Sequence, residues 1–276
     1  MAKQIGIVKI TGMLEDLVFY EHPEDGALVR TKSRKTSEQM KASPDYQQTL
    51  QNAAEFTNSI HSGELLRKAF RPLLFPIADG KLSSRMNKVM LEIIQLDTLQ
   101  DFGERMVQPG SAAMLEGFEF NCHSPLKTSF LAPYTITADA TAGLIHIDIP
   151  PFAPNKAVVA NGYVKTVKLV SGAATIDFER ESYSNDFWKT EPITLDNEPV
   201  EPLRFSYPFQ LAPGQVFFLT LGLQQWVHMD ELPKKDISKR KYWLVRKMRD
   251  AHKMMPFTGG MVVVRVAIFG NSTRLS

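Results

Sequence analysis

Residues 205–223 read FSYPFQLAPGQVFFLTLGL, and this stretch decides the fold. In its first half, aromatic and aliphatic residues alternate with Ser206 and Gln210 at a period of two, which is typical of a strand with one buried face. Pro213 and Gly214 then form a turn signal. Residues 216–223 are apolar at almost every position, as expected of a central strand covered on both faces.

Other segments of the second half of the chain repeat this alternation. Isoleucines alternate with His146 and Asp148 in residues 145–149, apolar residues alternate with acidic ones in residues 176–181, and residues 261–269 are almost wholly apolar. Several short strands separated by turn signals predict an antiparallel β-sandwich. The side chains that we expect to be mostly buried are Phe205, Tyr207, Phe209, Leu219, Leu221, Val264 and Val266.

The middle of the chain has a helical period. Residues 43–45, Ser-Pro-Asp, form a helix start signal, because serine caps, proline suits the first turn and an acid suits the positive end of the helix dipole. Gly63 is expected to interrupt the helical segment, and a further helix is expected from about Leu82. The apolar residues at helical spacing are Tyr46, Leu50, Ala53, Ala54, Ile60, Leu65, Leu66, Ala69, Phe70, Leu73, Met86, Val89, Met90, Ile93 and Ile94.

The first thirty residues predict a β-meander of three short strands, near residues 5–8, 17–20 and 27–30. The turn from Pro23 to Gly26 joins the last two strands, because proline presets its φ and glycine accepts a left-handed conformation. A small meander is marginally stable in water, so it has to pack on something.

These patterns predict an α+β protein with an N-terminal β-meander, a middle helical segment and a C-terminal antiparallel β-sandwich. A domain boundary near residue 115 is indicated by the helix-breaking residues Gly103, Pro109 and Gly110. We therefore expect two domains, residues 1–115 with the meander and helices, and residues 116–276 with the sandwich. A basic insertion near residues 233–256 is expected between the last two strands.

Several motifs of the chain resemble an uncharacterised family of bacterial hypothetical proteins. The motifs are the opening GIVKITG, then DLVFY, DG and LVR, followed by SPDYQQTLQNAAEF, LLRKAFRPLL, GFEFN and APYT. The likeness covers the first half of the chain well and the sheet region loosely, and the basic stretch from Lys234 departs from it. The resemblance implies a bacterial or bacteriophage-like origin and no particular activity.

Composition excludes several classes of protein. Of the 276 residues, 43% are hydrophobic and 22% are charged, which is ordinary for a globular protein, and a net charge of +2 commits the whole chain to neither nucleic acid nor membrane. Its single cysteine, Cys122, can form neither an internal disulfide nor a multi-thiolate metal site. Without a signal peptide or a long apolar run, the chain is expected in the cytoplasm or in a particle assembled there.

No motif predicts catalysis. Gly80-Lys81 lacks the serine or threonine of a phosphate-binding loop, and neither G-x-G-x-x-G nor G-x-S-x-G occurs. We therefore predict no catalytic residue, no cofactor and no metal site.

Three short constellations of polar residues have plainer interpretations than catalysis or metal binding. Cys122 and His123 are neighbours in sequence, so on a strand they would point to opposite faces and could not form an activated pair. His146 and Asp148 share a strand face, but two ligands without a third favour solvated polar positions. The three acids Asp177, Glu179 and Glu181 are expected on an exposed sheet face.

The strongest compositional anomaly is the stretch KKDISKRKYWLVRKMRDAHK, residues 234–253. It carries nine lysines and arginines against two aspartates, a net of +7, while the rest of the chain carries −5. Tyr242 and Trp243 could stack on nucleic-acid bases. Apolar residues at helical spacing instead indicate an amphipathic helix with a solvated basic face, or one that docks on an acidic protein surface. We favour these interpretations over nucleic-acid binding.

A second basic patch, Arg30 to Lys35, directly follows the meander. Such a patch is more often a solvated linker than a site, but together with the meander it forms an arm suited to packing on a neighbour. The residues predicted for interaction are Arg30, Lys32, Arg34, Lys35, Lys239, Arg240, Lys241, Tyr242, Trp243, Arg246 and Lys247.

The leading functional hypothesis is a non-enzymatic structural or interaction protein that self-associates or packs on partner subunits of a phage-like or other bacterial assembly. The alternative is a ligand- or glycan-binding module with Tyr183, Phe187 and Trp188 at its loop ends, because sugar rings stack on aromatic faces. An enzyme of unrecognised type is the least supported hypothesis.

Overall fold

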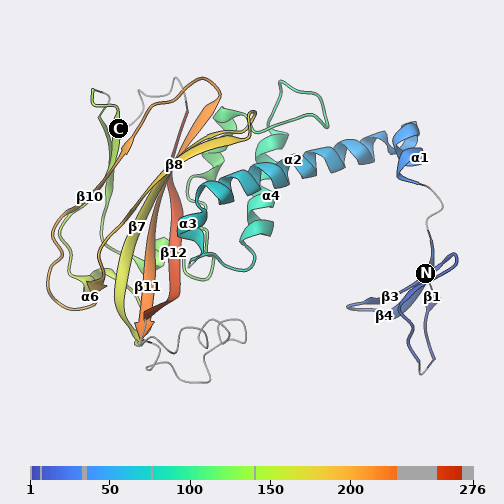
Figure 1. The fold of residues 1–276 in the computed structure, drawn as a ribbon, viewed down its shortest axis with the longest axis horizontal. Helices are drawn as coiled ribbons and strands as arrows, with labels where there is room; N and C mark the ends of the chain where they lie inside the picture. Colours follow the sequence, from blue (N-terminus) through green and yellow to red (C-terminus); the bar gives the residue numbers. More distant parts are fainter. Residues whose placement is uncertain are drawn as a thin grey trace. The chain divides into compact units, whose positions relative to one another are not determined.

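The computed structural model of this chain describes residues 2–6, 8–32, 36–75, 77–139, 141–228 and 254–268. The chain divides into two compact units, residues 1–52 and residues 53–276. Antiparallel strands come first, helices follow, and two antiparallel sheets complete the chain (Figure 1). The predicted α+β class and order of elements are confirmed.

The first unit contains an antiparallel sheet of the strand order β1-β4-β3-β2. Its strands are β1 (Ala2–Lys3), β2 (Gly12–Leu14), β3 (Leu17–His22) and β4 (Gly26–Thr31). The strand predicted near residues 5–8 is wrong, since Ile5 and Val8 lie outside any strand. The Gln4 side chain causes this difference, because it accepts a hydrogen bond from the Ile10 N–H and donates one to the Ile10 carbonyl, closing a loop between β1 and β2.

The first helices begin differently from the prediction. Helix α1 (Ser37–Ala42) is capped by Thr36, whose side chain accepts from the Gln39 N–H while the Gln39 side chain accepts from the Thr36 N–H. The start signal at Ser43 produces the short 3₁₀ helix η1 (Pro44–Tyr46), which leads directly into α2 (Gln47–Ala69).

The second unit contains two antiparallel sheets. The larger has the order β12-β11-β7-β8, with β9 also paired to β7, and the smaller has the order β10-β6-β5. The strands are β5 (Thr135–Asp139), β6 (Leu144–Ile149), β7 (Val164–Asp177), β8 (Ser182–Lys189), β9 (Ile193–Thr194), β10 (Leu203–Pro208), β11 (Gln215–His228) and β12 (Met254–Ile268). The accompanying helices are α3 (Arg71–Leu74), α4 (Leu82–Gln95), η2 (Pro109–Leu115), α5 (Leu126–Ser129) and α6 (Pro154–Ala157).

Strand β11 lies between two hydrophobic cores, as its apolar sequence predicted. Val216 and Phe218 point into a core shared with α2, α3 and α4. Phe217 and Leu219 point the other way, into a core shared with Ile147 and other residues of the smaller sheet. The second unit therefore has three layers, with helices on one face of the larger sheet and the smaller sheet on the other (Figure 1).

Helix α2 runs through Gly63 without the predicted interruption. A Cβ atom at Gly63 would lie 3.2 Å from Met86 Cγ, so the missing side chain lets α2 approach α4 closely. Ser59 and Glu55, one and two turns earlier, are also buried. The buried stripe of α2 therefore passes through these small or paired residues, and not through the predicted Leu50, Ala53 and Ala54.

Helix α4 confirms its prediction. It begins at Leu82, and its buried residues are Leu82, Met86, Met90, Ile93 and Ile94. Because these helical residues share one core with the larger sheet, the compact units divide between Asn52 and Ala53, and not near residue 115 where the sequence period changes. The predicted basic insertion near residues 233–256 lies mostly outside the described residues.

Residues 117–120 cover the outer edge of β12. The Gly117 and Phe120 N–H groups donate to the carbonyls of Val263 and Met261, and the Val263 N–H donates back to the Phe118 carbonyl. The next segment of chain presses so closely on β12 that a Cβ atom at Gly260 would lie 2.3 Å from the Ser124 carbonyl oxygen. An edge that could pair with another chain is thereby occupied within the protein.

None of the seven side chains predicted to be mostly buried is largely exposed, and five of them are fully buried. They are Phe205, Tyr207, Leu219, Leu221 and Val266. Phe209 and Val264 are partly exposed and pack on the margin of the core between the sheets. Phe209 lies just after β10, with its ring edge-to-face with Phe217 at a centroid separation of 5.1 Å.

This difference in burial predicts a difference in stability. Replacing the fully buried Phe217 with alanine should lower the free energy of unfolding by about 3–5 kcal/mol. The same change at Phe209 should cost clearly less, because its site is already partly hydrated. Urea denaturation of both variants measures the two losses, and a larger loss for Phe209→Ala would contradict the observed layering.

The packing of the chain against β12 gives a second prediction. Gly260→Ala should destabilise the protein by about 3 kcal/mol or more, because backbone atoms and not a movable side chain oppose the new methyl group. Gly162→Ala is the matched control, since nothing lies within 4 Å of a Cβ atom at that position. Thermal unfolding should show a loss for the first variant and almost none for the second.

Candidate functional site

The register of the meander sheet assigns its side chains to two faces. Residues directly opposite each other in neighbouring strands share a face, and side chains alternate along each strand. The pairs Leu14–Leu17, Leu17–Thr31 and Phe19–Val29 therefore lie on one face, which we call the apolar meander face. Its members are Ala2, Leu14, Leu17, Phe19, Glu21, Ala27, Val29 and Thr31.

None of the side chains on the apolar meander face is buried. Leu14 is 64% exposed and Leu17 is 40% exposed. Leu28, the one buried residue of the four strands, lies on the opposite face. The neighbours of Leu28 on that face include the charged Lys3 and Arg30. A small sheet that keeps this much apolar surface in contact with water is a candidate interaction surface.

The structure describes two of the predicted interaction residues. Arg30 is exposed at the end of β4, with its guanidinium carbon 5.8 Å from the centroid of the Tyr20 ring on the same face. Lys32 is also exposed, and its N–H donates to the Asp16 carbonyl. The remaining predicted residues, Arg34, Lys35, Lys239, Arg240, Lys241, Tyr242, Trp243, Arg246 and Lys247, lie outside the described residues.

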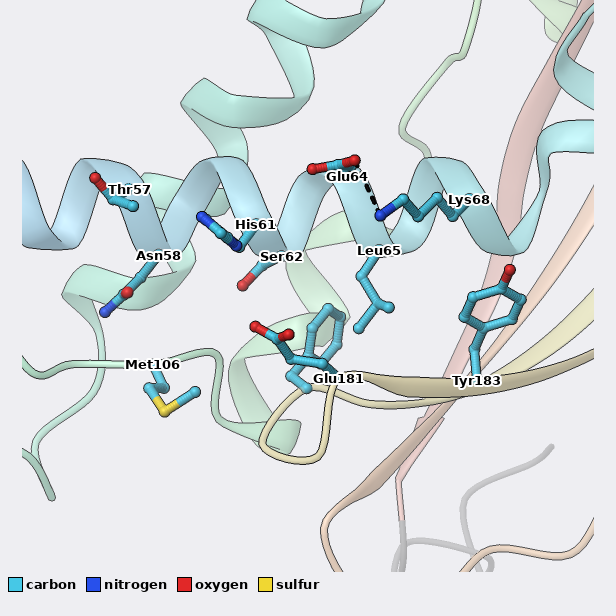
Figure 2. Close-up of a pocket in the computed structure, with 11 residues that line it drawn as sticks. Thr57, Asn58, His61, Ser62, Glu64, Leu65, Lys68, Met106, Glu181 and Tyr183 are labelled. Atoms are coloured by element: carbon cyan, nitrogen blue, oxygen red, sulfur yellow. Dashed lines mark ion pairs between the residues drawn. The ribbon is translucent and has the colours of Figure 1, made fainter.

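A separate groove lies in the second unit, between α2 and the turn that joins β7 to β8. Its volume is about 490 Å³, within the usual range for small-molecule sites. Figure 2 shows α2 along one wall and the start of β8 along the other, with Met106 at one end. The polar lining residues are Thr57, Asn58, His61, Ser62, Glu64, Lys68, Glu181 and Tyr183, and the apolar ones are Leu65, Met106 and Phe178.

Charge in the groove is partly compensated. The Lys68 ammonium lies 3.0 Å from the Glu64 carboxylate one turn earlier, and its hydrogen bond and positive charge lower the pKa of Glu64. Glu181, on the opposite wall, forms no ion pair within the described part of the chain. Its backbone has a φ of 50°, a left-handed conformation that turns the chain into β8.

Contacts next to the groove hold β8, one of its walls, against the end of α2, the other wall. The Asn185 side chain donates to the Ala69 carbonyl at 2.6 Å, which ties β8 to the last turn of α2. Phe187 packs edge-to-face on Phe70, with ring centroids 6.5 Å apart. The groove is therefore formed by the packed structure itself and needs no closing movement.

The three aromatic residues proposed for glycan stacking have different surroundings. Tyr183 is 44% exposed and lines the groove, where its ring stands upright from β8 toward α2 (Figure 2). Phe187 is partly buried against the helix-side core, so its ring is taken up by packing. Trp188 is 49% exposed, but it lies five positions after Tyr183 and hence on the opposite face of β8.

The acidic residues 177–181 do not form the exposed sheet face that was predicted. Asp177 ends β7 and is buried, and its carboxylate accepts a hydrogen bond from the Arg180 N–H at 2.9 Å. Glu179 and Glu181 are exposed in the turn itself. The alternation broke down because a turn, closed by the Asp177 side chain, replaces the strand after that residue.

His146 and Asp148 do share one face of β6, as predicted, but each is bonded across the sheet. His146 Nδ1 lies 2.8 Å from the Ser206 hydroxyl. The Asp148 carboxylate accepts hydrogen bonds from Thr137 and from the Arg204 guanidinium. Cross-strand hydrogen bonds within the sheet therefore occupy both side chains.

Cys122 and His123 lie in a loop that is organised by a buried carboxylate. Asp79 accepts hydrogen bonds from the N–H groups of Cys122 and Lys81 and from the Arg85 side chain. The Cys122 and His123 side chains are exposed, and no hydrogen bond joins the thiol to the imidazole within the described structure. These hydrogen bonds stabilise the loop, and the Cys122 thiol and the His123 imidazole do not form an activated pair.

Among the described residues, no three histidine, cysteine or acidic side chains gather in a way that could hold a metal ion. No helix in the same part of the chain is long and apolar enough to cross a membrane.

Comparison with protein-family models, with curated proteins and with solved structures found no match to this chain. The family resemblance of its motifs therefore stays an expectation, and the function has to be argued from the two surfaces described above.

Sequence reasoning missed the groove. The residues of α2 that line it form a stripe that resembles an ordinary solvated surface, at positions 57, 58, 61, 62, 64, 65 and 68. The single signal was Tyr183, an aromatic residue predicted near a loop end. The opposing wall comes from a hairpin more than a hundred residues later, which no local pattern reveals.

The loop carboxylate predicts a pH dependence of stability. Burial by itself would raise the pKa of Asp79, but the hydrogen bonds from Cys122, Lys81 and Arg85 outweigh it and lower the pKa from 3.8 to about 2. Because the folded state holds the proton less tightly than the unfolded state, the stabilisation is present above about pH 4 and is lost as the pH falls toward 2. Asp79→Asn should be less stable at neutral pH and should lose less stability on acidification, which denaturant titrations at several pH values would measure.

Proposed function

We propose that this protein is a non-enzymatic structural or interaction protein whose meander packs on another subunit. The observation that carries the proposal is the apolar meander face, none of whose side chains is buried. Covering a leucine side chain contributes about 1.5–3 kcal/mol, so Leu14 and Leu17 favour any arrangement that removes them from water.

The form of the sheet supports packing through its face and not through its edges. Its two edge strands, β1 and β2, have only two and three residues. Such short edges offer few backbone groups for strand pairing. The opposite face carries the charged Lys3 and Arg30 and the polar His22, which favour contact with water.

A second copy of the chain is the partner proposed first. Two apolar meander faces can pack on each other about a two-fold axis, which is the commonest symmetry of homo-oligomers. A stable contact needs more than about 1,000 Å² in total, so residues beyond the strands would contribute to it. In the broader form of the proposal, a different subunit of a phage-like or other bacterial assembly packs on the same face.

The test compares two neighbouring residues of β2. Light scattering on the full-length protein should show a species larger than the 31.1 kDa monomer. Leu14→Lys should shift it to the monomer, because the charge enters the apolar meander face. Met13→Lys is the matched control, since Met13 is 70% exposed on the opposite face, and it should leave the assembly unchanged.

The proposal is abandoned if the wild-type protein stays monomeric at high concentration and also fails to bind any subunit encoded beside it. Equal behaviour of the Leu14→Lys and Met13→Lys variants would refute the assignment of the contact to this face.

A further inference from the structure

The groove between α2 and the β7–β8 turn is a second site, independent of the meander. All of its lining residues lie between Thr57 and Tyr183, within the second unit. We propose that it binds a neutral saccharide of one or two sugar rings.

The aromatic component of such a site is Tyr183. A sugar ring presents an apolar face of C–H groups, which packs well on the face of an aromatic ring. Tyr183 is about half-exposed and lines the groove, whereas the other aromatic lining residue, Phe178, is buried in the core beneath it. The groove therefore offers one accessible aromatic platform.

The polar component surrounds this ring with both donors and acceptors. The Ser62 hydroxyl has no hydrogen-bond partner within the described structure. Asn58 also lines the groove, and because its amide nitrogen donates to the Arg105 carbonyl, its amide oxygen keeps its acceptor capacity. Thr57 likewise donates to the Ala53 carbonyl and keeps its lone pairs. Sugar hydroxyl groups both donate and accept, so they match such a mixed lining.

The charges in the groove argue against ionic ligands. Among the lining residues, the one ammonium group of Lys68 stands against the two carboxylates of Glu64 and Glu181, so negative groups outnumber it. A phosphate, sulfate or carboxylate ligand would face repulsion from Glu181 and Glu64. A cationic ligand would find Glu64 already paired with Lys68, and only Glu181 available. A neutral, hydroxyl-rich ligand is not repelled by the carboxylates and does not need an unpaired carboxylate as its partner.

The size and stiffness of the groove agree with a small ligand. Its volume of about 490 Å³ suits one or two sugar rings better than a long chain. The contacts of Asn185 with Ala69 and of Phe187 with Phe70 hold its walls in place. A preformed site binds without a large ordering cost.

Saturation-transfer NMR on the full-length protein tests the proposal. The neutral probes are cellobiose, maltose and N,N′-diacetylchitobiose, and the charged probes are putrescine and inorganic phosphate. At least one disaccharide should bind the wild-type protein. Tyr183→Ala should weaken that binding about tenfold or more, while Tyr183→Phe should retain most of it.

Trp188→Ala is the matched control, because Trp188 is similarly exposed on the opposite face of the same strand, and it should bind like the wild type. Glu181→Gln should change saccharide affinity only a few-fold, since the amide still forms hydrogen bonds. The Leu14→Lys variant should bind the saccharide normally, so failure here and failure of the assembly proposal are distinguishable.

Three results would overturn the inference. The first is that none of the disaccharides binds. The second is that Tyr183→Ala, with an unchanged circular dichroism spectrum, binds as well as Trp188→Ala. The third is that putrescine or phosphate binds the groove in preference to the disaccharides, which would replace the neutral saccharide by an ionic ligand.

Discussion

The architecture of the second unit depends on one constraint, the burial of β11 on both faces. Successive side chains of a strand point to opposite sides, so Val216 and Phe218 require one apolar layer while Phe217 and Leu219 require another. The helices supply the first layer and the smaller sheet supplies the second. A strand of this composition could not occupy the edge of a sheet or face water, so it organises the elements around it.

The way in which the helices meet this constraint also creates the groove. Helix α2 is buried along Glu55, Ser59 and Gly63, where small side chains and the ion pair of Glu55 with Arg105 allow close contact with neighbouring segments. A helix that is buried along one stripe presents its other faces to water or to whatever lies opposite. The β7–β8 turn lies opposite one of these faces, and the polar stripe from Thr57 to Lys68 becomes a wall of the groove.

The two candidate surfaces differ in their physical character and hence in the ligands that suit them. The apolar meander face is an exposed and mostly apolar sheet surface, and a protein surface of matching shape is the partner that we propose for it. The groove is concave and lined by both polar and apolar groups, which suits a small hydroxyl-rich molecule. A protein with both surfaces could attach to an assembly through one unit and hold a ligand with the other.

The sequence alone determined the order of the elements and the central position of β11, because periods of two and near four follow directly from backbone geometry. It also determined helix α4, whose predicted apolar positions 82, 86, 89, 90, 93 and 94 face one core. Only the tertiary structure decided that α2 buries Glu55 and Gly63, since a carboxylate becomes compatible with burial when Arg105, fifty residues away, reaches it. The turn at Asp177 and the pairing of α2 with the β7–β8 hairpin were likewise decided in three dimensions. Local patterns record which residues favour a face, but not which distant segment will cover it.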